Sequence, residues 1–595
     1  GIDVPPTKQL VDLSVLNYLH SELREERSLK SLGPILGTHA YAETLKTSRF
    51  KSPTDKNLIS YNAQDTHNTM LAIAELSKRL IKDKFNSTID YGEYSLDFYS
   101  KSIWATITMS ENGVPMSSLK LKDLFEKLNK QANEAIEQAK EYDLILQGEG
   151  SATSKDKFFT EVITLIEQTC CPDIMDKMDV TPKSKRVSFN KKNRTTLLEH
   201  LPDTEENQDY RNAIKLANEH SECLKLISSY CYPLLYHRRN KPEDMSSIII
   251  PPNMKLPTHQ TVNVPVYKTP ADRVDAADKD PSKEKIRIMK NRFAGGLNQI
   301  RRRGDAIAYP TWYVTPSHIK NDIGSAGGTI QGRITCKQPS AQTFPKKIKE
   351  CMRSRYKGGK IVAMDLSQAE LRVAALISGE SSMISAYNDG MDLHADRARS
   401  LWGDYDKSSD LQHQRRQVGK MMNFADLFLS SANTMKEQVY AQSNGDIDIP
   451  LTFYQQVVKS RNEVRPQLSE WQRNLLHIAK TTHQIVLPLT GQSRTFFGDL
   501  GKSRSEIVNF PVQTTAGNLT LAIQHHLLPK LNLSERMFLQ IYDAIYIECP
   551  DNCVDSVVNK VNESVNEVIT QGYWHKLEQF YERSVTLKHD MEVWD

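Results

Sequence analysis

Two apolar segments, each carrying one aspartate, constrain the fold of this chain more than any other feature. "KIVAMDL" (360–366) has the pattern of a strand that carries Asp365 near its C-terminal end. "MFLQIYDAIYIEC" (537–549) alternates apolar and polar residues around Asp543, as in a strand that turns back on itself. The section between the segments, 368–530, is long and helical in pattern. The two aspartates can meet if their segments become neighbouring strands of one sheet.

Paired carboxylates at strand ends suit divalent cations, because a strand end is rigid and opens into a cleft. If Asp365 and Asp543 meet, they can hold a pair of magnesium ions. Two simpler interpretations stay open at this point. Asp365 can cap the helix that follows it, and Asp543 can be an ordinary turn residue.

Length and composition set wide limits. A chain of 595 residues is too long for one hydrophobic core, so several domains are expected. A net charge of +4 does not by itself indicate nucleic acid. The eight cysteines form no CxxC pair and have no histidine at zinc spacing, so we expect reduced thiols and a cytoplasmic location. No apolar run can span a bilayer and no signal-like N-terminus is present, so we expect no membrane partner.

A predicted helix between the aspartates has a two-part face. In "QRRQVGKMMNFADLFLSS", Arg416, Lys420, Phe424 and Phe428 recur every four residues, so a helix over 414–429 places them on one side. The face is cationic at one end and aromatic at the other, which matches the phosphates and the base of a nucleoside triphosphate. The alternative is a core helix with two solvated bases.

Three other stretches are informative. Residues 119–142 and 210–234 have the patterns of long helices, whereas 144–195 is rich in loop residues. Within that zone, 183–194 holds six basic residues and no acidic one, which indicates either a solvated loop or a tip that contacts phosphates. Residues 241–300 are rich in proline and lysine and lack periodicity, as in an insertion or linker.

These segments, in this order, resemble the family A (DNA polymerase I-like) DNA polymerases over residues 95–595. Asp365 to Arg372 is similar to the family's motif A, the helix of Arg416 to motif B, and the Tyr542-Asp543-Ala544 turn to motif C. Five further segments match the family's patterns: "TIQGRITCKQPSAQTFP", "MDLHADRA", "LPLTGQSRTF", "VNFPVQTTAGNL" and "LKLISSYCYPL".

The resemblance implies an α/β (α+β) right-hand polymerase fold with palm, fingers and thumb, preceded by a truncated RNase H-like 3′–5′ exonuclease remnant. The expected domains are 1–95, the C-terminal part of the exonuclease-like domain; 96–240, palm entry and thumb; 241–370, insertion and first part of the palm; 371–525, fingers; and 526–595, second part of the palm.

The implied activity is DNA-templated addition of dNTPs to a primer 3′ end during DNA replication. By analogy, Asp365, Asp543 and the carbonyl of Leu366 bind two Mg²⁺ ions, for which Mn²⁺ can substitute. Lys420 is expected to be catalytic, and Glu370 to be the steric gate that excludes a 2′-hydroxyl. The expected nucleotide-binding residues are Arg416, Lys420, Phe424, His394, Gln368, Glu370 and Phe428.

The same analogy implies contacts to primer-template DNA. The expected DNA-binding residues are Arg333, Gln342, Asn509, Gln513, Lys225, Ser229, Tyr230, Lys185, Arg186, Lys191 and Lys192. The 241–310 stretch is interpreted as an insertion on the duplex-facing side. A phage replicative enzyme in the host cytoplasm fits these features, and a helicase, single-strand-binding protein or processivity factor is a candidate partner.

Several departures from the family pattern leave an alternative open. Tyr61 and Asp65 resemble the third motif of a proofreading exonuclease, but its other motifs are missing, so this chain alone is not expected to proofread. Phe428-Leu429 replaces a Tyr-Gly pair, and Ala544 replaces a carboxylate. A non-catalytic nucleic-acid-binding relative is therefore the alternative, and a single-subunit RNA polymerase is a third hypothesis. Retention of Glu370 argues against both.

Overall fold

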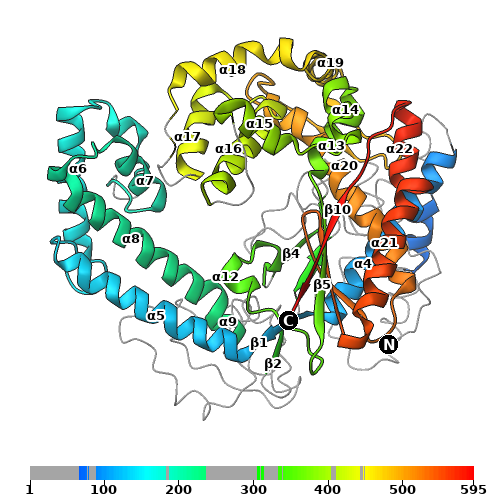
Figure 1. The fold of residues 1–595 in the computed structure, drawn as a ribbon, viewed down its shortest axis with the longest axis horizontal. Coiled ribbons are helices and arrows are strands. Elements are labelled where there is room, and N and C mark those ends of the chain that lie inside the picture. The colour runs from blue at the N-terminus through cyan, green and yellow to red at the C-terminus, as the bar shows by residue number, and fades with distance from the viewer. Residues whose placement is uncertain are drawn as a thin grey trace. The chain divides into compact units, whose positions relative to one another are not determined.

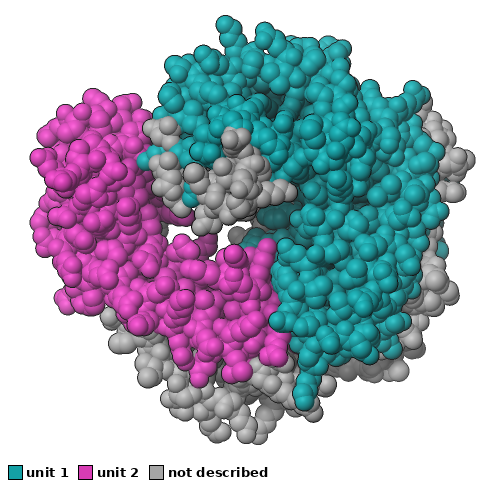
Figure 2. Space-filling model, in the orientation of Figure 1, with its two compact units in different colours: residues 1–113, 310–343, 354–595 teal, residues 114–309, 344–353 magenta. Residues whose placement is uncertain are grey.

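The computed structural model describes residues 66–74, 76, 78, 89–181, 186–235, 305–308, 310–313, 333–337, 339–403, 410–442, 447 and 449–595. The chain divides into two compact units (Figure 2). Unit 1 consists of residues 1–113, 310–343 and 354–595, and unit 2 of residues 114–309 and 344–353. Both aspartates of the sequence analysis belong to unit 1.

Unit 1 is built on a four-stranded antiparallel sheet in the order β10-β5-β9-β8. The strands are β5 Lys360–Leu366, β8 Arg536–Ile541, β9 Ala544–Cys549 and β10 His589–Trp594. β8 and β9 form the predicted hairpin, and β9 pairs with β5. The two aspartate-bearing segments are therefore neighbouring strands, as the sequence predicts.

Helices cover the sheet at β8 and β9 and bury polar as well as apolar residues of these two strands. The helices that pack on it are α4 Ile89–Asn112, α20 Arg504–Leu527 and α21 Val554–Thr570 (Figure 1). All six residues of β9 are buried. Buried polar groups need partners. Two such pairs are present here: Gln524 donates to Gln540 at 2.7 Å, and Arg355 forms an ion pair with Glu548.

The section between β5 and β8 is helical, as predicted, apart from the short hairpin of β6 Gln484–Val486 and β7 Ser493–Thr495. Its helices are α13 Ala369–Ser378, α14 Ser381–Asn388, α15 Leu393–Trp402, α16 Asp410–Leu427, α17 Ala432–Gln442, α18 Leu451–Val464 and α19 Pro466–Thr482. Helix α16 packs through Val418, Met422 and Ala425 against residues of α17 and α18. Because this apolar side is packed, the side of α16 that carries Arg416, Lys420 and Phe424 is left for a functional role.

Smaller elements complete unit 1. They are the paired strands β3 Thr311–Tyr313 and β4 Thr335–Lys337, the 3₁₀ turns η7 Ala341–Thr343, η8 Leu528–Lys530 and η9 Asp551–Cys553, and helix α22 Tyr573–Tyr581. The β3–β4 pair matters below, because Arg333 immediately precedes β4.

In its described residues, unit 2 is mainly helical. Its elements are α5 Ser118–Lys140, α6 Ser151–Thr169, η2 Ile174–Lys177, α7 Lys191–His200, η3 Glu205–Asn207, α8 Gln208–Leu226, the π-helical turn η4 Ile227–Cys231, α9 Tyr232–Leu235, α12 Lys346–Lys349 and the paired strands β1 Val114–Ser117 and β2 Asp305–Ala308. The long helices α5 and α8 pack on one another. An apolar core between α6, α7 and α8 includes Phe158, Phe159 and Leu197.

The structure confirms some of the expectations for unit 2 and corrects one. Helices α5 and α8 lie where the periodicity predicts them. The 144–195 zone was expected to be rich in loops, but α6 and the start of α7 occupy much of it, because apolar residues at helical spacing bury one side of α6. Residues 241–304 of the expected insertion lie outside the described residues. Its end forms β2, which pairs with β1. No helix in the described ranges is long and apolar enough to cross a membrane.

Candidate active site

The two aspartates lie where adjacent strands end. Asp365 is the penultimate residue of β5, and its partner across β9 is Ala544. Asp543 occupies the two-residue turn between β8 and β9, and the amide of Leu366 donates to the carbonyl of Asp543 at 3.3 Å. Asp365 is not a helix cap, because Gln368 holds that position at the start of α13. Asp543 is a turn residue, but the turn places it beside β5.

The Asp543 carboxyl is buried at the end of the hairpin, close to both cations and other acids. Its Oδ1 is buried and has no hydrogen-bond partner among the described residues. Burial raises the pKa of Asp543 to about 7; the cations of Arg333 and Lys420 oppose this shift, and the carboxylates of Glu370 and Asp365 add to it. A buried carboxylate oxygen without a donor, next to a second acid, fits a divalent cation. In the described part of the chain, no group of three or more histidine, cysteine, aspartate or glutamate side chains is arranged to hold a metal.

The sheet register shows which carboxylates flank Asp365. Ala544 lies opposite it on β9, where the resemblance places a third acid, and Asp590 lies opposite it on β10. Cross-strand partners project from the same face of a sheet, so Asp590 is an additional acid that the sequence analysis did not identify. Glu548 cannot substitute for the missing acid, because it is fully buried in its ion pair with Arg355.

The side chains predicted to share one face of α16 lie close to one another. The Nζ atom of Lys420 lies 5.9 Å from the centre of the Phe424 ring. The Phe424 and Phe428 rings are stacked, with centroids 5.9 Å apart and planes 15° apart, and the His394 ring lies 5.9 Å from that of Phe424. Helix α16 ends at Leu427 rather than 429, but Phe428 still donates its amide to the carbonyl of Phe424 at 2.9 Å. Cations and aromatic rings therefore follow one another along one side.

Asp392 organises the cationic end of this face, and the sequence analysis did not identify its role. It caps α15 by accepting the amides of His394 at 2.9 Å and Ala395 at 3.2 Å. It also accepts from Arg416 Nε and from Gln368 Nε2, both at 2.8 Å. Burial opposes its ionisation, but the hydrogen bond and charge of Arg416 and the two amides outweigh burial and lower the pKa of Asp392. In the sequence, an aspartate of the helix-capping type two residues before His394 could have indicated this role.

Glu370 and Arg333 form an ion pair at the other end of the site. The guanidinium of Arg333 also lies 5.8 Å from the centre of the exposed Tyr542 ring. A Cβ atom on Gly517 would lie 3.1 Å from Arg333 Cγ, so the side chain of Arg333 packs directly on α20. Asn509 and Gln513 precede Gly517 at helical spacing on the same side of α20. The structure thus brings Arg333, Asn509 and Gln513 to one helix face.

The other residues predicted to contact DNA differ in exposure and in their partners. Gln342 is held by backbone groups, donating to Ile334 and accepting from Cys336, both at 3.1 Å. In unit 2, Lys225 and Ser229 are exposed near the end of α8, and Tyr230 packs edge-on against Phe344.

The basic tip of unit 2 is only partly free for phosphates. Arg186 and Lys192 form ion pairs with Asp156 and Asp179, each at 2.6 Å, and Lys191 is exposed. Lys185 and the two exonuclease-like residues, Tyr61 and Asp65, lie outside the described residues.

Three non-glycine residues around the site have left-handed backbones. They are Gln368 (φ 54°), Leu429 (φ 58°) and Tyr542 (φ 51°). Gln368 is itself a predicted site residue, Leu429 follows Phe428, and Tyr542 precedes Asp543. Such strain persists only where surrounding structure enforces it. Leu429 keeps the conformation that a glycine would adopt freely, although its side chain fills the hinge position.

Comparison with known proteins gives a consistent result. The family model described as "DNA polymerase family A" matches residues 311–593. The chain is 26% identical to a DNA polymerase of Bacillus phage SP01 over 260 residues, 40% of this chain and 28% of that protein. It is 29% identical to the thermostable DNA polymerase I of Thermus aquaticus over 239 residues, 37% of this chain and 27% of that protein. These matches span less than a third of the relatives' length.

One solved structure supports the fold. The POL domain of Pol1 from M. smegmatis, in complex with DNA primer-template and dNTP, superposes with a TM-score of 0.59 and 14% identity, covering 98% of this chain and 81% of that one. The predicted α/β right-hand fold is therefore confirmed.

Proposed function

Because residues 311–593 belong to DNA polymerase family A, we propose that this chain adds dNTPs to the 3′ end of a primer on a DNA template. The observation that carries the proposal is the pairing of β5 with β9, which sets Asp365 beside Asp543. The Asp543 carboxylate oxygen, which has no hydrogen-bond partner among the described residues, and the cationic and aromatic face of α16 belong to the same unit. A protein that only binds nucleic acid has no need of this arrangement.

Asp365, Asp543 and the carbonyl of Leu366 would hold the divalent cations, two Mg²⁺ ions with Mn²⁺ as a substitute. When bound, these cations supply the charge that activates the primer 3′-hydroxyl and stabilises the leaving pyrophosphate. The acids themselves are placed by main-chain hydrogen bonds between strands, so they need little reorganisation before reaction.

The residues of α16 and α15 bind the nucleotide. Arg416, held by Asp392, and Lys420 neutralise the triphosphate. The charge of Lys420 also acts on the Asp543 carboxyl. In this proposal Lys420 delivers a proton to the leaving pyrophosphate as a general acid. The stacked rings of Phe424 and Phe428 provide an apolar surface for the sugar and base.

Glu370 selects the sugar by volume. Its carboxylate is fixed by the ion pair with Arg333, so it cannot easily rotate away from a 2′-hydroxyl. Arg333, Asn509 and Gln513 form a polar strip on α20 that suits the minor-groove edge near the primer end. Minor-groove acceptors are alike in every correct pair, so such a strip senses pairing geometry rather than sequence.

A primer-extension assay separates the hypotheses. A labelled primer-template is incubated with the chain, Mg²⁺ or Mn²⁺, and either dNTPs or rNTPs. Extension with dNTPs alone is expected. Efficient extension with rNTPs would favour an RNA polymerase, and tight DNA binding without any extension would favour the non-catalytic relative.

A further inference from the structure

A buried asparagine holds the histidine of the proposed nucleotide site. Asn423 lies on α16, is fully buried, and places its amide between His394 and Arg465. Its Oδ1 accepts from Arg465 Nη2 at 2.8 Å, and its Nδ2 donates to the carbonyl of Leu393 at 2.9 Å. The same Nδ2 lies 3.3 Å from Nδ1 of His394. The residue therefore joins α15, α16 and the α18–α19 junction.

These partners determine which atom donates and which accepts in each hydrogen bond from Arg465 through Asn423 to His394. A guanidinium can only donate and a backbone carbonyl can only accept, so the Asn423 amide cannot be turned around. Its second Nδ2 hydrogen then faces Nδ1 of His394, which must be the acceptor. In a neutral imidazole the proton must accordingly be on Nε2. Nε2 makes no hydrogen bond to any residue in the described ranges.

The surroundings of His394 also disfavour a second proton. The side chain is 3% exposed. Burial lowers the pKa of His394 to about 3; Asp392 opposes this shift, and the cations of Arg416, Lys420 and Arg465 add to it. These four are the charged groups that face the ring from α15, α16 and the α18–α19 junction. The ring is therefore neutral at physiological pH.

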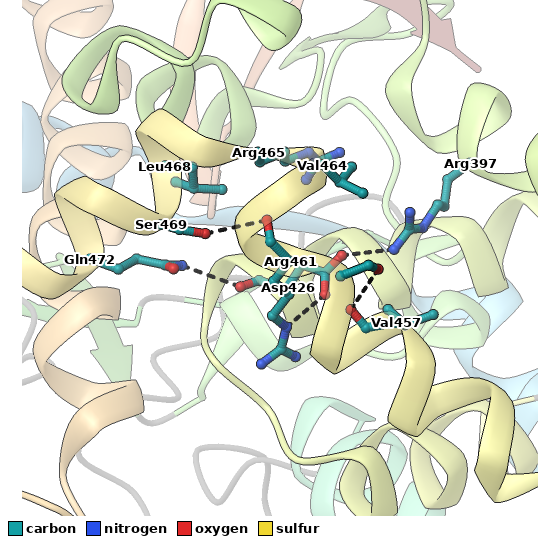
Figure 3. Close-up of a pocket in the computed structure, with 10 residues that line it drawn as sticks. Arg397, Asp426, Val457, Arg461, Val464, Arg465, Leu468, Ser469 and Gln472 are labelled. Atoms are coloured by element: carbon teal, nitrogen blue, oxygen red, sulfur yellow. Dashed lines mark hydrogen bonds and ion pairs between the residues drawn. The ribbon is translucent and has the colours of Figure 1, made fainter.

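Arg465 is itself held in place. It lies between α18 and α19, next to the buried cluster in which Arg397 and Arg461 converge on Asp426 (Figure 3). Its Nη1 is buried and has no hydrogen-bond partner in the described part of the chain, and the hydrogen bond from Nη2 to Asn423 orients the guanidinium. The Asn423 amide is therefore oriented by Arg465, a group that can only donate.

We propose that Asn423, oriented by Arg465, is a positioning residue that keeps His394 neutral with its proton on Nε2, so that His394 donates a hydrogen bond to the triphosphate and brings no charge. This inference rests on the proposed function and specifies one contact within it. The positive charge at the triphosphate then comes from Arg416 and Lys420, whereas His394 provides direction. Its contribution to nucleotide binding is accordingly independent of pH near neutrality.

The ring state can be measured without catalysis. Histidine nitrogen NMR on the full chain, with the signal assigned by His394→Gln, reports the proton on each ring nitrogen. At pH 7 we expect a neutral ring with Nε2 protonated. In Asn423→Asp, which is nearly isosteric but offers only acceptors, Nδ1 becomes protonated. A wild-type ring protonated on Nδ1, or on both nitrogens, would refute the positioning role even in a chain that extends primers.

A pH profile of nucleotide binding provides the functional readout. In Asn423→Asp, the carboxylate keeps a proton on Nδ1 of His394. At low pH both ring nitrogens are protonated and Nε2 can still donate to the triphosphate. At high pH Nε2 carries a lone pair instead and cannot donate. The KM for dNTP, relative to wild type, should then rise about tenfold with pH, as loss of a hydrogen bond to a charged group predicts. The same substitution in a His394→Gln background should give a flat ratio. A flat ratio in both backgrounds would overturn the inference, whereas absence of any primer extension by wild type would refute the proposed function instead.

Discussion

At the scale of single residues, the site is defined by side chains whose charge partner decides their role. Glu370 is the clearest case, because its ion pair with Arg333 fixes the position of its carboxylate. Asp543 is the opposite case, since its buried oxygen has no donor. The first arrangement suits a steric barrier, and the second suits a binding site for a cation.

Shortening Glu370 should relax sugar selection. Glu370→Ala removes the volume that would collide with a 2′-hydroxyl, so incorporation of rNTPs relative to dNTPs should rise about tenfold or more. Glu370→Gln keeps the volume and is the matched control, with selection close to wild type. Competitive single-nucleotide incorporation measures both ratios. Equal sugar selection in Glu370→Ala and wild type would remove Glu370 from the gate.

Acid should destabilise the protein through His394. Its pKa falls from 6.5 when unfolded to about 3 when folded, so the folded state resists protonation. The stability that depends on a neutral ring is complete above pH 6.5 and is lost as pH falls toward 3, by up to about 1.4 kcal/mol per pH unit. His394→Gln removes this pH-dependent contribution to the free energy of unfolding. Urea unfolding at several pH values should show a shallower loss for the variant, and parallel curves would contradict the assignment.

At the scale of elements, contacts of α16 with α15, α18 and α19 fix the helix on the side away from its cationic and aromatic face. Asp426 accepts from Arg397 on α15 at 2.7 Å and from Arg461 on α18 at 2.9 Å (Figure 3). Gln472 of α19 donates to the carbonyls of Asp426 and Leu427, which satisfies the C-terminal end of the helix. The functional face therefore depends on contacts on the opposite side.

Removing the charge of Asp426 should loosen this attachment. Asp426→Asn leaves the largely buried guanidinium groups of Arg397 and Arg461 around a neutral side chain. Breaking a buried ion pair from one side costs about 3 kcal/mol. Asp396→Asn, exposed on α15, is the control and should change unfolding free energy by less than about 0.5 kcal/mol. Denaturant unfolding measures both. Similar values for the two variants would show that the cluster does not anchor α16.

The close approach of α15 and α16 depends on a single glycine. A Cβ atom at Gly419 would lie 2.3 Å from the carbonyl oxygen of His394 and 3.2 Å from the amide of Ala398. Both atoms are backbone, so Gly419→Ala must displace α15 and should destabilise the protein by about 1–3 kcal/mol. The KM for dNTP should also rise, because His394 moves. Gln414→Ala, at an exposed position of α16, should leave both quantities unchanged.

At the scale of the molecule, the sequence predicts the parts whose local pattern and tertiary role agree. The pairing of β5 with the β8–β9 hairpin follows from apolar strand patterns, and the face of α16 follows from the four-residue spacing of Arg416, Lys420, Phe424 and Phe428. The right-hand fold was predicted from the motifs and their order.

What the sequence could not predict depends on strand order and buried partners. Asp590 is far from Asp365 in the chain, and only the addition of β10 to the sheet edge makes the two residues neighbours. Asp392 resembles an ordinary helix cap until Arg416 and Gln368 are seen to bind it. The polar residues of β8 and β9 gave no sign that they would be buried and paired.

The most direct test of the two-acid site compares single-turnover incorporation of one dNTP by Asp543→Asn and Asp590→Asn. Both substitutions neutralise one carboxylate near Asp365 and preserve side-chain volume. The rate should fall at least about a hundredfold in Asp543→Asn and stay within about threefold of wild type in Asp590→Asn. Near-normal incorporation by Asp543→Asn, or an equal loss in Asp590→Asn, would contradict a site that works with Asp365 and Asp543 alone.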